Sequence, residues 1–147
     1  MQNRTPISIA DLEVALEWSS SGQPYESQAF IDRTTGELHL QSMHGELGEL
    51  LPPDLEDSSQ YIAMPHKNDL DLGRQLVFDF ADSESPHMAD EVRRIFREKG
   101  AYGRFKVLLE RTGELQKWYE FENAATQKAL LQWAEDNGFQ VEGGNAN

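Results

Sequence analysis

The sequence contains no cysteine among its 147 residues. This absence excludes disulfide bonds, zinc sites with thiolate ligands, iron–sulfur clusters and cysteine nucleophiles. The opening residues form no basic and apolar leader, and no apolar run is long enough to cross a membrane. We therefore expect a cytoplasmic protein with no membrane partner. At this length we expect one domain over residues 1–147, with residues 1–6 and 142–147 flexible.

Short catalytic and nucleotide-binding motifs are also missing. The chain has no P-loop, no Rossmann fingerprint, no G-x-S-x-G, no H-E-x-x-H and no EF-hand pattern. Its glycines are scattered among turns, and none forms a loop that would cradle a phosphate. We therefore expect no cofactor, no bound metal and no catalytic residues. These absences favour a protein that is not an enzyme.

Basic residues are few and unevenly placed. The chain has 13 Lys and Arg against 26 Asp and Glu, a net charge of −13. Residues 1–90 carry 4 basic and 17 acidic residues, whereas residues 91–111 carry 7 basic and 3 acidic ones. An acidic surface favours solubility, and pairing with that surface would explain the basic stretch. The other interpretation is that residues 91–111 form a binding surface.

The N-terminal half shows the signals of one helix and a small sheet. Ser8 is placed to cap a helix, and Gly36 suits a hairpin turn in which we expect Asp32 to act as a cap through its own side chain. Residues 43–60 are interpreted as an acidic surface loop, and Pro65 stops the last strand. The predicted elements are a helix over residues 9–19, hairpin strands at 29–31 and 38–40, and a short strand at 61–64.

The C-terminal half shows helical spacing almost throughout. We expect one helix from an Asn68 cap to Phe80, another from Pro86 to Gly100, and three short helices in tandem over residues 102–133. Gly113 and Gly138 are placed as helix stops. The aromatic residues of this segment are interpreted as core or wall rather than as a platform for stacking bases: Phe105, Trp118, Tyr119, Phe121 and Trp133.

These elements predict an α+β fold, in which a small antiparallel sheet (the hairpin plus one short strand) packs with four to five helices and the C-terminal half is helix-rich. Five segments, in this order, resemble the bacterial proteins of uncharacterised protein family 0158: DLEVALEWSS, AFIDRTTGELHL, YIAMPHKNDLDLGRQLVFDF, GAYGRFKVLLERTGELQKWYEFE and ALLQWAEDNGF. The most specific parts are the RFK-x-LLER run, the WY-x-FE pair and the Asp-Leu-Gly at Asp71. The resemblance covers residues 7–140. It implies a small bacterial protein of α+β type and supplies no function or site residues.

Metal-dependent hydrolysis is one candidate chemistry. The cluster from His66 to Asp71 combines an imidazole with the carboxylates of Asp69 and Asp71. Residues two apart point to different faces of a helix, however, and acidic residues near a helix start are explained by the helix dipole. The ionisable residues considered for such a site are Asp32, His39, His44, His66, Asp69, Asp71 and His87.

Binding through the basic stretch is the other candidate. Its cations, with Tyr102 and Phe105 between them, suit phosphates and a stacked base. Against this, the net charge opposes a polyanion, and Glu91, Glu98 and Glu110 would pair with part of the stretch. We therefore favour a protein-interaction or regulatory module with a protein partner, and keep nucleic-acid binding as the alternative. Opposite charges on one small chain would also favour self-association. The predicted binding residues are Arg93, Arg94, Arg97, Arg104 and Tyr102.

Overall fold

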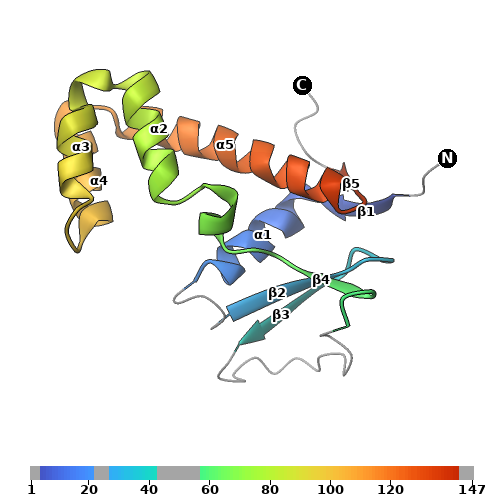
Figure 1. Cartoon of the computed structure of the whole chain (residues 1–147). Coiled ribbons are helices and arrows are strands. Elements are labelled where there is room, and N and C mark those ends of the chain that lie inside the picture. The colour runs from blue at the N-terminus through green and yellow to red at the C-terminus, as the bar shows by residue number, and fades with distance from the viewer. Residues whose placement is uncertain (1–3, 22–26, 43–56, 143–147) are drawn as a thin grey trace. The chain divides into compact units, whose positions relative to one another are not determined.

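The computed structural model describes residues 4–21, 27–42 and 57–142. The chain forms two compact units, one of residues 1–69 with 127–147 and the other of residues 70–126. Helices and strands are both present, and the sheets are small, so the predicted α+β class is confirmed (Figure 1). The single domain inferred from chain length stays a prediction. The predicted loop at 43–60 lies outside the described residues up to position 56.

The first unit contains a three-stranded antiparallel sheet in the order β3-β2-β4. The strands are β2 (Ser27–Asp32), β3 (Leu38–Ser42) and β4 (Tyr61–Ala63). The predicted hairpin and short strand are therefore confirmed, and β4 lies at the sheet edge, where a strand that ends near a proline is tolerated.

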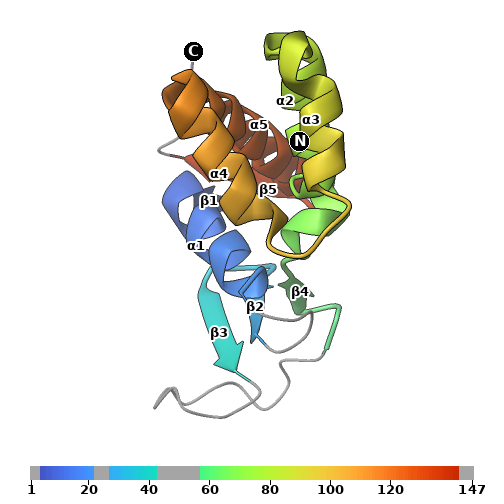
Figure 2. The same ribbon diagram turned by 90° about the vertical axis from the view of Figure 1, so that its left-hand side faces the viewer.

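Helix α1 (Ile9–Ser19) packs against β2 and β3 (Figure 2). It starts as predicted, because the Ser8 side chain accepts a hydrogen bond from the Asp11 N–H at 3.0 Å. Most of its apolar positions share one buried helical face, whereas Val14 is exposed. The buried residues of α1 are Ile9, Leu12, Ala15, Leu16 and Ser19.

A second sheet of the first unit joins the two ends of the chain. Strands β1 (Thr5–Ser8) and β5 (Phe139–Glu142) pair in parallel, with Thr5 opposite Phe139. The Arg4 guanidinium donates to the carbonyl oxygens of Glu135 and Phe139 at 3.0 and 3.3 Å. The flexibility predicted for residues 1–6 and 142–147 stays a prediction, and residues 5, 6 and 142 of these ends lie in paired strands. Local patterns cannot show such a pairing, because each strand's partner lies at the other end of the sequence.

The second unit packs helices around a cluster of aromatic rings. Its elements are α2 (Arg74–Glu84), the short 3₁₀ helix η2 (Pro86–Met88), α3 (Ala89–Ile95), α4 (Ala101–Thr112) and the first part of α5 (Leu115–Asp136). Phe80 is fully buried and contacts Phe105, Trp118 and Phe121 edge-on. The core interpretation of Phe105 and Trp118 is confirmed, whereas Tyr119 lies at the surface.

Three predicted helix boundaries were wrong for local reasons. Helix α2 starts at Arg74 rather than after Asn68, because residues Lys67–Leu70 form a 3₁₀ turn (η1) and Asp71 has a positive φ of 57°. Helix α3 ends before Gly100. Residues 102–133 lie in two helices instead of three, since neither glycine nor proline interrupts α5. The Gly113 stop is confirmed, with a φ of 75°.

Position 36, in the β2–β3 turn, requires glycine for two reasons, of which the first is its positive φ of 78°. A Cβ at this position would overlap the carbonyl oxygen of Pro6, which belongs to β1. Gly138, in the same unit, also has a positive φ, of 86°, but no atom lies within 4 Å of a Cβ there. A substitution at Gly138 therefore tests backbone strain alone, whereas a substitution at Gly36 tests backbone strain together with steric overlap.

We expect Gly36→Ala to lower the free energy of unfolding by at least about 1 kcal/mol more than Gly138→Ala. Both substitutions place alanine at a positive φ, but only Gly36→Ala forces the β2–β3 turn away from β1. Chemical denaturation with an unchanged m value measures the difference. Equal losses for the two variants would contradict the close approach of the turn to Pro6.

Candidate functional site

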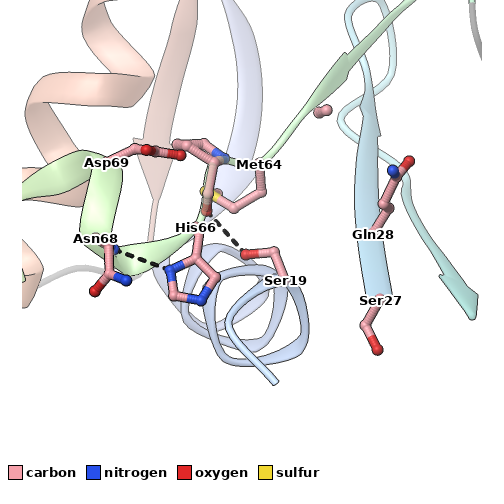
Figure 3. A pocket seen from close by; sticks show the side chains of 9 residues that line it. Ser19, Ser27, Gln28, Met64, His66, Asn68 and Asp69 are labelled. Carbon is pink, nitrogen blue, oxygen red and sulfur yellow. Dashed lines mark hydrogen bonds between the residues drawn. The ribbon is translucent and has the colours of Figure 1, made fainter. Parts of the chain in front are cut away.

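The first unit contains a pocket of about 480 Å³ beside the start of β2 (Figure 3). Two of the ionisable candidates from the sequence, His66 and Asp69, line it together. Asp71 is exposed and is not among the described residues that line this pocket, so the pocket does not bring the whole predicted cluster together. Other residues that line the pocket are Ser19, Ser27, Gln28, Met64 and Asn68.

The pocket forms where the chain leaves the sheet after β4. The last hydrogen bond of β4 with β2 runs from the Met64 N–H to the Ala29 carbonyl oxygen, and the next donor in this register would be His66, because the backbone nitrogen of Pro65 faces away from β2. The chain instead turns into η1 at Lys67. The last turn of α1 holds the departing segment: the Ser19 hydroxyl donates to the Pro65 carbonyl oxygen at 2.9 Å, and the Ser20 hydroxyl oxygen accepts from the Lys67 N–H at 3.0 Å. One wall of the pocket is therefore fixed by side-chain hydrogen bonds.

His66 is oriented by its own backbone segment. Its Nδ1 accepts a hydrogen bond from the Asn68 N–H at 3.1 Å, which places the proton of the neutral ring on Nε2 (Figure 3). The Ser19 hydroxyl donates to the carbonyl oxygens of Leu16 and Pro65, so its proton is not directed at an imidazole. The described lining thus offers hydrogen-bond donors and acceptors for binding, and it contains no nucleophile–base pair.

Asp32, another candidate, is a buried turn cap. Its Oδ1 accepts from the Thr34 N–H at 2.8 Å, the Thr34 hydroxyl at 2.6 Å and the Thr35 N–H at 3.2 Å, and Gln60 donates to both oxygens at 3.1 Å. Burial acts to raise the pKa of this carboxyl group, but the hydrogen bonds outweigh it and hold the pKa below its usual value. The predicted capping role is confirmed, and the bonds occupy the carboxylate.

The remaining ionisable candidates make structural contacts or lie outside the described residues. His39 packs edge-on against Tyr61, with ring centroids 5.7 Å apart. His87 lies 3.8 Å from a carboxylate oxygen of Glu114. His44 falls outside the described ranges. Within those ranges, no group of three His, Cys, Asp or Glu side chains is placed to hold a metal ion.

The basic residues of the second unit are mostly paired with carboxylates. Arg93 forms two hydrogen bonds with Asp82, at 2.8 and 2.7 Å, and its guanidinium lies 5.0 Å from the centre of the Phe78 ring. These hydrogen bonds raise the pKa of Arg93 and lower that of Asp82. Arg104 binds Glu98 at 2.8 Å.

Glu91 is shared by two further cations, since Arg94 and Arg111 both lie 3.5 Å from the same oxygen. The predicted pairing of the basic stretch with Glu91 and Glu98 is therefore confirmed. Three cations of this stretch, Arg97, Lys99 and Lys106, form no ion pair with any residue that the structure describes.

The five predicted binding residues fall on two adjoining parts of the second unit. Arg93, Arg94 and Arg97 surround a depression of about 390 Å³ on α3. Arg104 and Tyr102 lie on α4, where Tyr102 is 49% exposed and contacts the Phe96 ring edge-on at 5.0 Å. Partial burial of Tyr102 raises the pKa of its hydroxyl group.

Val107 was missed by the sequence reasoning. It is 59% exposed, although it is an aliphatic residue in the middle of α4. The pattern contains the signal: at 100° per residue, Val107 lies opposite the buried face formed by Phe105, Leu108 and Leu109. An apolar residue opposite the core face of a helix is not needed for packing of that helix.

Comparison with known proteins adds a family and no activity. The sequence profile of an uncharacterised protein family, UPF0158, matches residues 5–144. The chain belongs to this family. The resemblance of the five segments is thereby confirmed, and the family carries no assigned function. No curated protein and no solved structure matches the chain. Among the described helices, none is both long enough and apolar enough to span a membrane.

The contacts of Arg93 and Arg97 predict different effects of replacing them. We expect Arg93→Ala to lower the melting temperature, because it removes the paired hydrogen bonds to Asp82 and the contact with Phe78. Arg97→Ala should leave the melting temperature within error of the original chain. Thermal unfolding followed by circular dichroism measures both, and Arg93→Lys serves as a variant that keeps the charge but not the paired geometry. A melting temperature reduced as much by Arg97→Ala as by Arg93→Ala would contradict these contacts.

Proposed function

We propose that the chain is a protein-interaction module without catalysis that acts through the outer surface of α4. We define the α4 surface as Tyr102, Arg104, Lys106 and Val107. The observation that carries the proposal is the exposure of Val107 and Tyr102, each with an exposed basic residue one turn away on α4: Arg104 for Val107 and Lys106 for Tyr102. The predicted arginines Arg93 and Arg94 on α3, and Arg97 just after it, would extend this surface.

The composition of the α4 surface is that of a protein interface. Tyrosine and arginine are enriched at interfaces, and an apolar residue with a polar surround supplies the contact that excludes water. The fold does not require this composition, since Phe105, Leu108 and Leu109 already bury the opposite side of α4. The free cations favour a partner that presents carboxylates.

A protein partner is favoured over a nucleic acid by the state of the cations. Phosphate backbones are bound by many cations that exchange their counterions for phosphates. Here Arg93, Arg94, Arg104 and Arg111 are engaged with carboxylates of the chain itself. The whole chain also carries a net charge of −13, which opposes a polyanion.

The test is affinity capture from a bacterial lysate, with and without nuclease, using two matched pairs of variants. Val107→Ser is compared with Val14→Ser, which changes an exposed valine on α1. Lys106→Glu is compared with Lys128→Glu, which changes an exposed lysine on α5. Within each pair, the two variants carry the same type of substitution at different positions of the chain.

We expect a defined protein that resists nuclease and whose capture falls about tenfold with Val107→Ser and with Lys106→Glu. Val14→Ser and Lys128→Glu should capture it as well as the original chain. The proposal is overturned if the captured material is nucleic acid that nuclease removes, if all four variants capture alike, or if no protein is captured.

A further inference from the structure

The central strand β2 directs its backbone groups alternately to its two neighbours. The Asp32 N–H donates to the Glu37 carbonyl oxygen at 2.9 Å, on the β3 side. The Arg33 N–H donates to the Gln60 carbonyl oxygen at 2.8 Å, on the β4 side. Since antiparallel strands alternate in this way, the odd-numbered residues of β2 direct their N–H and C=O groups toward β4.

The hydrogen bonds between β2 and β4 stop at Ala29 and do not reach Ser27, the first residue of β2. The last of these bonds runs from the Met64 N–H to the Ala29 carbonyl oxygen, at 2.8 Å. If the register continued, His66 would lie opposite Ser27, but the chain turns away at Pro65. The N–H and C=O of Ser27 therefore face the pocket and form no hydrogen bond with any described residue. Among the described residues, the edge of β2 is therefore open at this point.

The gap beside Ser27 is a fixed feature of the first unit rather than a loose strand end. The Ser19 side chain holds the segment that leaves the sheet at Pro65 (Figure 3). The Ser20 side chain holds it at Lys67. A preformed gap of this kind avoids the entropy cost that a ligand would otherwise meet on ordering its site. Its volume of about 480 Å³ falls within the range of ligand pockets.

The charge around the pocket selects the kind of ligand. Asp69 is the acidic side chain among the described lining residues, and His66 and Asn68 add hydrogen-bonding groups. The unit that contains the pocket, residues 1–69 with 127–147, has 4 Lys and Arg against 15 Asp and Glu. A cationic ligand is therefore complementary to both the pocket and its surroundings.

We propose that this pocket binds an extended, cationic peptide segment. The peptide adds a short strand to β2 at the position that β4 would occupy if it continued beside Ser27. The backbone of the peptide would exchange hydrogen bonds with Ser27, and a lysine or arginine side chain would pair with Asp69. Addition of a strand to an open edge is an established mode of peptide recognition. The site is independent of the α4 surface, because it lies in the other unit and has the opposite charge preference.

The probe is the blocked peptide acetyl-Val-Lys-Val-Lys-amide, titrated into ¹⁵N-labelled full-length protein and followed by amide chemical shifts. Because one pair of backbone hydrogen bonds and one ion pair are available, we expect a dissociation constant on the order of 10–100 μM. The Ser27 amide should move downfield on binding. A peptide with glutamate in place of lysine and a peptide with N-methylated backbone should each bind at least about tenfold more weakly.

The protein variants are Asp69→Asn and, as a control, Asp11→Asn, an exposed aspartate of α1 in the same unit. Asp69→Asn should weaken binding about tenfold, whereas Asp11→Asn and Lys106→Glu should not change it. The proposal is overturned if no binding occurs up to millimolar peptide, if the Ser27 amide does not move, or if Asp69→Asn binds as tightly as the original chain. Equal binding of the N-methylated peptide would also overturn it, since the site would then bind a cation without adding a strand.

Discussion

The departure of the chain from the sheet after Met64 determines the form of the first unit. In this register the backbone nitrogen of Pro65 faces away from β2, so the next ladder bond would come from His66, but the chain turns into η1 at Lys67 and leaves that position of the ladder empty. Serine side chains at the end of α1 hold the departing segment, so the gap beside Ser27 is kept open. The pocket, its open strand edge and the placement of His66 next to Asp69 all follow from the end of this ladder.

The second unit shows how one helix supports both packing and a separate surface. The inner side of α4 packs Phe105 against the ring of Phe80, where the contacts are edge-on and the side chains are buried. The outer side carries Val107 and Lys106, which the packing does not use. Most neighbouring arginines are paired with carboxylates, so the surface has fewer free cations than its composition indicates. The two units thus carry the two proposed binding sites, the peptide pocket and the α4 surface, which have opposite charge preferences in our proposals.

Local signals in the sequence predicted those features that local chemistry controls. The Ser8 cap, the Asp32 turn and the Gly113 stop each depend on residues within a few positions of one another. The prediction of a helix that starts at Asn68 was wrong, because the positive φ of Asp71 prevents a helix from continuing there. A single sequence does not reveal that conformation. The β1–β5 pairing and the pocket depend on partners distant in sequence and on strand register, which periodicity does not encode. Pairing of the arginines with Glu91 and Glu98 was foreseen from the acidic residues within the basic stretch, although Arg111 and Glu91 lie twenty positions apart, and the third predicted partner, Glu110, forms no ion pair with a described residue.

The open edge of β2 is tested most directly by amide hydrogen exchange in the free protein, resolved at Ser27 and Gln28. These adjacent residues of one strand direct their N–H groups to opposite sides, so strand fraying affects both alike. The predicted result, after correction for intrinsic rates, is slow exchange at Gln28, which faces β3, and much faster exchange at Ser27, which faces the pocket. Equal protection of the two amides would contradict an open edge, because it would mean that another part of the chain already pairs with Ser27.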